Sequence, residues 1–300
     1  MLQNAYVLLV FTTVCWAGNA VAGQLAVGEV APLTLVFLRW FLVAAGMGWL
    51  LRHELRRSWP VARNHLGTLA VMAVVGFTGF NALFYVASVR TSGINIGIIQ
   101  GSIPMIVLAG SVIAYRTRIG AAQIVGVGLT LSGVVTVAAR GSLERLLGLE
   151  FNPGDLIMLF ACLLYGGYTV ALKSRPGLPA LVFFTWLALL AVLATLPLLA
   201  FEAATSGLVW PSARGWAVTF YVAIFPSCLA QISFIRGVEL IGPERAGIFV
   251  NLVPIFAALL SVVILQQSFE QHHAAALALV LGGIAVAERH KTHDAQAKRP

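Results

Sequence analysis

Long apolar runs separated by short polar connectors form the dominant pattern of this chain. A helix needs about 20 mostly apolar residues to cross the hydrocarbon core of a bilayer. Ten segments of that kind are present: 5–25, 32–51, 66–88, 94–114, 121–139, 154–173, 179–201, 213–235, 243–264 and 272–288. The pattern therefore predicts an all-α integral membrane protein with ten transmembrane helices.

The pattern repeats at an offset of 150 residues, which places equivalent residues in phase. Pro254 falls on Pro104, Phe234 on Phe84, Ser261 on Ser111 and Gln231 on Asn81. Because each copy holds five spans, an odd number, the two copies must insert in opposite orientations, as in many secondary transporters. We expect a first five-helix repeat at 1–139, a linker at 140–153, a second five-helix repeat at 154–290 and a polar cytoplasmic tail at 291–300.

The composition excludes an ordinary soluble domain. The chain is 59% hydrophobic and 10% charged, whereas soluble domains carry about 25% charged residues. Its net charge of +8 does not indicate nucleic-acid binding, because Lys and Arg lie in connectors beside apolar spans, where they set topology. With a cytoplasmic N-terminus, 14 of the 19 basic residues lie on the cytoplasmic side and 4 outside. Both termini are therefore predicted to be cytoplasmic, in a multi-pass protein of the cell inner (plasma) membrane.

The residue patterns of catalytic and metal sites are not found in the sequence. Cys15, Cys162 and Cys228 lie in apolar segments without a CxxC pair, and the six histidines lie in loops or at span ends. All eleven acidic residues lie in loops or at helix ends, so no acid–base pair is expected inside the membrane. We predict no catalytic residue, metal, cofactor or enzyme activity. The missing core carboxylate also predicts facilitated or exchange transport with weak pH dependence.

Neutral polar and aromatic side chains lie within the predicted spans. An amide that faced lipid would leave its hydrogen-bonding groups unpaired at a cost of several kcal/mol, so these groups face other helices or a wet cavity. Both readings stay open for any one amide, but their concentration in a few spans favours a cavity between the repeats. The candidate substrate-binding residues are Trp16, Asn19, Asn81, Tyr85, Gln100, Tyr165, Tyr168, Gln231, Phe249 and Asn251.

Two prolines and one arginine stand out within the spans. Pro104 and Pro254 occupy matched positions and should kink their helices, either as alternating gates or as static bends. Arg39 is the only charge well inside a span, and we expect it to reach the interface or pair with a helix C-terminus, with ligand contact as the alternative. Gly97 and Gly101 are spaced for close helix packing.

Several segments together resemble the EamA branch of the drug/metabolite transporter superfamily. The segments "CWAGNAVAGQ" (Cys15–Gln24) and "PLTLVFLRW" (Pro32–Trp40) are similar to that family's first two helices, and "TSGINIGIIQGSIPMIVLAGSVI" and "GPERAGIFVNLVPIFAALLSVVI" are similar to its fourth and ninth. The resemblance covers about residues 5–288 and is greatest to the YddG-type exporters of aromatic amino acids. The chain departs from the family pattern at Thr117 and Gln267, where many members have Glu.

The resemblance implies export of a small molecule through a central cavity between the repeats. Combined with the amides and aromatic residues above, it predicts an alternating-access transporter of amino acids or similar metabolites, with the lipid bilayer as its other partner and a monomeric chain. Two alternatives stay open. One is an exporter of lipophilic cations or drugs in the same fold, and the other is a non-transporting membrane assembly or lipid-handling protein.

Overall fold

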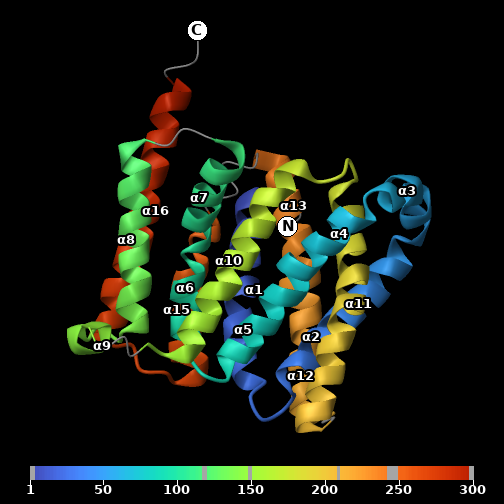
Figure 1. Ribbon diagram of the computed structural model, residues 1–300, viewed down its shortest axis with the longest axis horizontal. Coiled ribbons are helices and arrows are strands. Elements are labelled where there is room, and N and C mark those ends of the chain that lie inside the picture. Colours follow the sequence, from blue (N-terminus) through green and yellow to red (C-terminus); the bar gives the residue numbers. More distant parts are fainter. Residues whose placement is uncertain (1–3, 117–119, 148–150, 208–209, 242–248, 297–300) are drawn as a thin grey trace.

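A computed structural model describes residues 4–116, 120–147, 151–207, 210–241 and 249–296, and within these ranges every regular element is a helix (Figure 1). The part up to residue 138 contains α1 (Ala5–Leu25), α2 (Pro32–Leu50), α3 (Arg52–Asn64), α4 (Leu66–Met72), η1 (Ala73–Gly79), α5 (Phe80–Ser88), α6 (Gly93–Gln100), α7 (Ile103–Tyr115) and α8 (Ala121–Ala138). The part from residue 143 contains α9 (Leu143–Leu147), α10 (Pro153–Ala171), η2 (Leu172–Ser174), α11 (Ala180–Ser206), α12 (Ala213–Val222), η3 (Ala223–Leu229), α13 (Ala230–Ile241), α15 (Val253–Leu265) and α16 (Gln271–Gln296).

The apolar helices match the predicted spans. Eight helical runs in the described part of the chain are long and apolar enough to cross a membrane, and they coincide with the first eight predicted segments. The ninth and tenth correspond to the shorter apolar helices Val253–Leu265 and Gln271–Ala287. The all-helical membrane fold is thereby confirmed, while the count of ten spans and the side on which the termini lie stay predictions.

Three segments differ from the expected pattern. The basic connector at 52–65 forms the helix α3, whose charged residues are exposed. The expected fourth span is divided into α6 and α7 at Gly101 and Ser102. At the C-terminal end, α16 continues to Gln296, through most of the stretch expected as a polar tail.

The irregular features of the backbone recur at the same offset as the sequence pattern. The π-helical segments η1 and η3 begin and end 150 positions apart, as do α7 and α15. The left-handed residues Arg116 and Gln266, with φ of 52° and 53°, end α7 and α15 at matched positions. Because hydrophobic composition alone does not specify such breaks, their recurrence supports the proposed division into two repeats.

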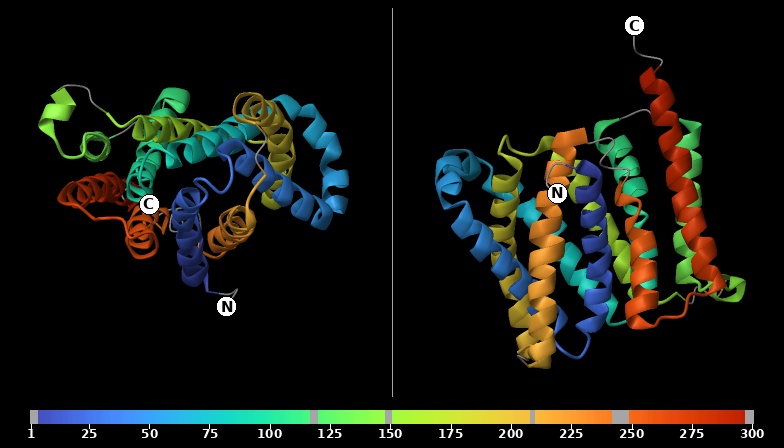
Figure 2. Two further views of the ribbon diagram at one scale, coloured as in Figure 1. Left: turned by 90° about the horizontal axis from the view of Figure 1, so that it is seen from below. Right: turned by 180° about the vertical axis from the view of Figure 1, so that it is seen from behind.

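Helices of the first half pack mainly against helices of the second (Figure 2). The pairs are α2 with α11, α6 with α15, α8 with α16, and α10 with α5, and α1 contacts both α13 and α15. Gly97 allows the α6–α15 approach, because a Cβ there would lie 2.3 Å from the Cβ of Ala257. Gly101 likewise packs against Val280 and Pro254, which confirms close packing at both glycines.

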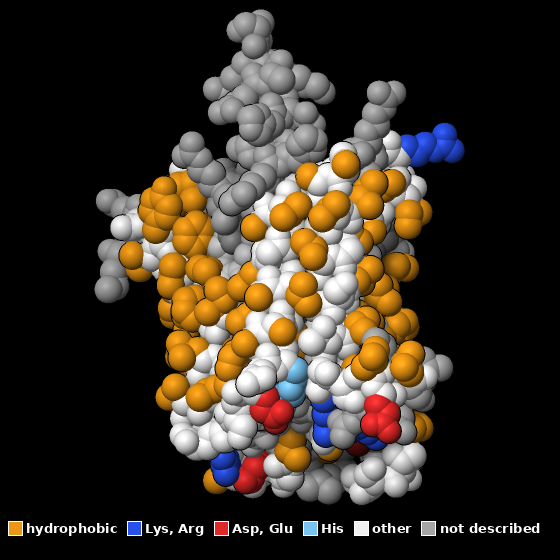
Figure 3. All heavy atoms as spheres, turned by 90° about the vertical axis from the view of Figure 1, so that its left-hand side faces the viewer, with side chains coloured by type: hydrophobic (Ala, Val, Ile, Leu, Met, Phe, Trp, Pro, Cys, Tyr) orange, Lys and Arg blue, Asp and Glu red, His pale blue; other side chains and the backbone are white. Residues whose placement is uncertain are grey.

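The outer face formed by α8 and α16 is apolar along most of its height (Figure 3). On α8, the exposed side chains include Ile124, Val125 and Leu131. Charged and histidine side chains gather at one end of this face (Figure 3). An apolar belt above a charged rim is the distribution expected where lipid tails give way to headgroups.

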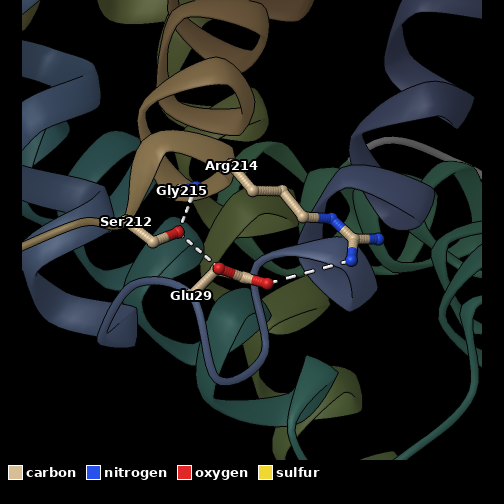
Figure 4. Close-up of polar contacts among 4 residues, drawn as sticks. All are labelled: Glu29, Ser212, Arg214 and Gly215. Atoms are coloured by element: carbon tan, nitrogen blue, oxygen red, sulfur yellow. Dashed lines mark hydrogen bonds and ion pairs between the residues drawn. The ribbon is translucent and has the colours of Figure 1, made fainter.

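That rim belongs to the end of the bundle at which α9, the α1–α2 loop and the start of α12 lie (Figure 1). We call this end of the bundle the linker end. Contacts between loops tie this end together. The carboxylate of Glu29 accepts a hydrogen bond from the hydroxyl of Ser212 and pairs with Arg214 at 3.8 Å, and the Oγ of Ser212 caps Gly215 at the start of α12 (Figure 4). The helix α3 lies at the opposite end (Figure 1).

Candidate functional site

A buried guanidinium lies at the centre of a polar cluster between the helices. Arg39 is only 6% exposed. Its Nη1 lies 2.8 Å from Oδ1 of Asn81 and 2.7 Å from the hydroxyl of Tyr85. The same nitrogen lies 3.2 Å from Oδ1 of Asn19, and Nε donates to Oγ of Ser227 over 2.8 Å. The cluster therefore joins α1, α2 and α5 to η3 of the second half.

The structure corrects the expectation for Arg39. The side chain neither reaches an interface nor pairs with a helix C-terminus, because its hydrogen bonds go to side chains on neighbouring helices. Arg39 lies seven residues inside α2 from Pro32, and Asn19 lies six residues inside α1 from Leu25. At 1.5 Å per residue, both are roughly 10 Å below the linker end of their helices. The positive charge is thus held inside the apolar part of the bundle.

A proline explains why a serine is available to Arg39. Pro226 has no N–H, so the carbonyl of Val222 loses the hydrogen bond that an α-helix would give it. The hydroxyl of Ser227 donates to that carbonyl over 2.7 Å instead, which leaves its lone pairs for Arg39. The carbonyl of Pro226 in turn accepts from Nε1 of Trp16 over 3.2 Å. The π-helical turn thereby supplies two links from η3 to the first half.

The other members of the cluster are held in fixed positions. Asn81 donates from Nδ2 to the carbonyl of Phe77 over 2.7 Å, which directs its carbonyl oxygen toward Arg39. Tyr85 donates its hydroxyl proton to Asn19 over 2.9 Å while accepting from Arg39. The sequence placed Asn81 and Tyr85 on one helical face, and the structure shows both meeting the same guanidinium.

Aromatic side chains lie on the α10 side of the bundle. The rings of Tyr165 and Tyr168 are 5.6 Å apart, and Tyr165 lies 4.8 Å from the ring of Phe80. Tyr168 lies over Gly76 of η1, where a Cβ would meet its ring at 2.3 Å. The ring of Trp16 lies 5.3 Å from that of Phe234 on α13, in a tilted arrangement. These rings offer apolar surface beside a polar cluster.

Three of the predicted site residues, Gln100, Gln231 and Phe249, have no described hydrogen bond or ring contact with this cluster. Gln100 ends α6, and its Nε2 is buried without a hydrogen-bond partner. Gln231 is the second residue of α13, and Asn251 lies two residues before the start of α15. Phe249 lies 5.9 Å from the ring of Tyr6, about 20 Å along α1 from Asn19. Their part in substrate binding therefore stays a prediction.

Between the cluster and the linker end lies a second hydrogen-bonded layer. Gln24 donates from Nε2 to the carbonyls of Ser88 at 2.7 Å and Thr91 at 2.6 Å. Thr91 donates its hydroxyl to Asp155, and Asn95 donates to both carboxylate oxygens of Asp155 at 3.1 and 3.2 Å. We call Gln24, Thr91, Asn95 and Asp155 the closing layer, since they join α1, α6 and α10 across this end.

Two acidic residues expected at helix ends are nevertheless buried. Asp155 is 1% exposed in the first turn of α10, within the closing layer. Glu202 is 7% exposed on α11 and accepts hydrogen bonds from the amides of Leu33 and Thr34. It thereby caps the first turn of α2, where a negative charge is favoured. Asp155 and Glu202 thus lie near helix ends, as expected, but are shielded from solvent.

The matched prolines begin helices after a break. Pro104 lies in the first turn of α7 and Pro254 in the first turn of α15. Before each proline, a backbone hydrogen bond spans three residues in place of four. The N–H of Ser102 donates to the carbonyl of Ile99, and that of Leu252 to the carbonyl of Phe249. Proline is favoured in the first turn of a helix because its missing N–H is not needed there. The expected kink is an interruption of the helix, and its role as a gate stays a proposal.

At Gln267, one of the two departures from the family pattern, the amide side chain accepts from the backbone N–H of Ile94 at 3.3 Å. The other departure, Thr117, lies outside the described residues. Within the residues that the structure describes, no group of three or more His, Cys, Asp or Glu could hold a metal ion. A surface hollow of about 720 Å³ at the linker end is lined by Arg140, Phe269, Glu270 and His272, away from Arg39.

Sequence reasoning did not assign Arg39, Ser227, Thr91 or Asp155 to a site. The signal for Arg39 was its charge inside a span, which marks a functional position by default. The signal for Ser227 was its place directly after a mid-span proline. For Thr91 and Asp155 there was no local signal, because their meeting depends on how α10 packs beside the α5–α6 turn.

A bundle of apolar helices that encloses a polar cluster between its spans is an arrangement found in membrane transporters. The chain belongs to the EamA-like transporter family, whose model matches residues 3–139 and 152–288. It is 27% identical to the uncharacterized transporter YetK of Bacillus subtilis (strain 168) over 95% of this chain and 86% of that protein. It is 24% identical to the aromatic amino acid exporter YddG of Ancylobacter novellus over 96% of this chain and 98% of that protein.

A solved crystal structure, described only as that of a protein, covers 94% of this chain and 96% of its own with a TM-score of 0.63. At 21% identity this likeness shows the shared fold alone. The relatives named above are transporters, which agrees with the absence of a catalytic pattern in the sequence.

Proposed function

We propose that this transporter exports amino acids, aromatic and other neutral ones, or similar small metabolites, by alternating access between its two repeats. The cluster around Arg39 is the observation that carries the proposal. It gathers a cation and several neutral oxygens between the two halves, within an otherwise apolar bundle. A zwitterion needs groups of both kinds, because its carboxylate seeks donors and its ammonium seeks acceptors.

Nearby aromatic side chains support a substrate with an apolar part. Trp16 is joined to Pro226, the neighbour of Ser227, and Tyr165 lies among the rings on the α10 side. Rings of this kind bind apolar or aromatic side chains by stacking and edge contacts. The similarity to an exporter of aromatic amino acids points to the same substrate class.

The closing layer indicates which end of the bundle is shut. It joins α1, α6 and α10 on the linker-end side of Arg39, so solute is expected to reach the cluster from the opposite end. If both termini are cytoplasmic, as the distribution of Lys and Arg predicts, that opposite end faces the cytoplasm. The structure then corresponds to the loading state of an exporter.

The cation exporter is the less favoured alternative. A lipophilic cation would approach Arg39, and no carboxylate among the described residues offsets that charge. Like charges in a medium of low dielectric constant repel strongly. A non-transporting role gains no support from relatives that are transporters.

Counterflow in proteoliposomes tests the proposal. Vesicles containing the purified chain are loaded with unlabelled amino acids, and entry of labelled phenylalanine, threonine and methionine is compared with protein-free vesicles. Entry above the control supports an amino acid carrier. Entry of labelled tetraphenylphosphonium in place of all three amino acids contradicts it. Removal of an imposed proton gradient should leave the rates unchanged, and their collapse would overturn the expected independence from protons.

A further inference from the structure

The guanidinium of Arg39 has no counter-ion among the residues that the structure describes. Its four hydrogen bonds go to an amide oxygen of Asn19, one of Asn81, and the hydroxyls of Tyr85 and Ser227. The two buried acids are engaged elsewhere, Asp155 with Thr91 and Asn95, and Glu202 with the start of α2. The buried cation is thus stabilised by neutral dipoles and by the rings of Trp40 and Tyr85, whose centroids lie 5.2 and 6.0 Å from its Cζ.

One nitrogen of this guanidinium is also unused. The described contacts engage Nε and Nη1 and leave Nη2 without a hydrogen-bond partner. Among described residues, the completely enclosed nitrogens that lack a partner belong to Trp40 and Gln100, and Nη2 is not one of them. The Nη2 atom is therefore not completely enclosed, although the side chain as a whole is buried.

Burying an uncompensated charge is costly, and charged residues within membrane spans pair with a partner or mark a substrate pathway. The neutral partners hold Arg39 in one orientation, and Ser227, Asn81 and Tyr85 are themselves fixed by other hydrogen bonds. A preorganised guanidinium with a free donor is suited to a carboxylate, because a hydrogen bond between two ionised groups is shorter and stronger than one between neutral groups.

We propose that Arg39 binds the carboxylate of the transported solute through Nη2, so that the substrate class is carboxylate-bearing small molecules. This inference rests on the proposed transport function and narrows its substrate. A single guanidinium matches one carboxylate, whereas a phosphate ester would call for several clustered cations. The amine of an amino acid then faces neutral oxygens and rings, and recognition depends first on the acid end.

A competition experiment on the unaltered full-length chain tests this directly. Counterflow of labelled phenylalanine in proteoliposomes is measured with unlabelled phenylalanine, 3-phenylpropionate, phenethylamine or phenylalaninamide as competitor. The expected result is competition by phenylalanine and 3-phenylpropionate, which share the carboxylate, and none by the amine or the amide. Equal competition by all four compounds overturns the inference and leaves amino acid transport standing.

Variants separate binding from a structural role. Arg39→Lys keeps the positive charge but loses the planar guanidinium group, and Arg39→Gln removes the charge. The KM for phenylalanine is expected to rise roughly 10- to 100-fold in Arg39→Gln and less in Arg39→Lys. Arg52→Gln is the matched control, because Arg52 is an exposed arginine whose described hydrogen bond goes to the carbonyl of Trp49. A lower maximal rate with unchanged KM in both Arg39 variants overturns the inference.

A binding measurement decides the case in which no amino acid is transported. Thermal unfolding of the detergent-purified chain is followed with 3-phenylpropionate or phenethylamine. Stabilisation by the carboxylate alone, lost in Arg39→Gln and kept in Arg52→Gln, supports the carboxylate site even if the proposed amino acid transport fails. Stabilisation by the amine to the same extent, or by neither compound, overturns it.

Discussion

Arg39 donates from Nε to the hydroxyl of Ser227 over 2.8 Å, although the two residues are 188 positions apart in the sequence. The bond joins α2 of the first half to the π-helical turn η3 of the second. Any movement of one half against the other must either break this bond or carry both residues together. Its energetic contribution is therefore the first quantity to measure.

Replacing Ser227 with Ala should destabilise the protein by about 1–3 kcal/mol, because it leaves the buried Nε of Arg39 without its partner. The midpoint of thermal unfolding in detergent measures the effect. Ser174→Ala is the control, since its exposed hydroxyl only bonds to the carbonyl of Ala171. Equal shifts in the two variants would show that the Arg39–Ser227 bond contributes nothing.

Asp155→Asn should weaken the closing layer. The substitution turns one acceptor of Asn95 into a donor, so a buried pair of N–H groups would face each other at a cost of about 1–3 kcal/mol. Amide hydrogen exchange over residues 93–96, at the start of α6, should become faster. The exposed Glu54→Gln serves as control. Unchanged exchange in Asp155→Asn would mean that the layer does not hold this end closed.

Gly97→Ala should separate α6 from α15. The new Cβ would lie 2.3 Å from that of Ala257, and overpacking of this kind costs about 1–3 kcal/mol. Gly128→Ala is the matched control within α8, because its Cβ would meet no atom within 4 Å. There the higher helix propensity of Ala should be neutral or stabilising by up to about 1 kcal/mol. Thermal unfolding of both variants distinguishes close packing from a general effect of removing glycine.

Replacing Pro104 with Ala tests whether the break between α6 and α7 serves as a gate. An N–H at this position could bond to the carbonyl of Gln100 and favour one continuous helix. We expect slower turnover in counterflow with an unchanged KM, and the same for Pro254→Ala at the matched break. Pro60→Ala, in the exposed helix α3, is the control. Normal turnover in both variants would identify the breaks as static.

The spans were predictable because they depend on local chemistry. Apolar runs of sufficient length predicted eight described spans and the two shorter apolar helices. The matched pair Pro104 and Pro254 predicted matched irregularities, since proline removes a donor wherever it stands. The π-helical turn at η1 had no such signal, because it contains no proline.

For the polar residues, the sequence determined one property and only the tertiary structure decided another. The sequence determined that Asn19, Asn81 and Tyr85 could not face lipid, because their polar groups require partners there. Only the packing of α1, α2, α5 and η3 decided that the partner is Arg39, and that Phe249 lies beside Tyr6 instead. Desolvation acts on each residue by its own chemistry, whereas a hydrogen bond requires two side chains to meet, and here they meet across up to 188 positions of chain.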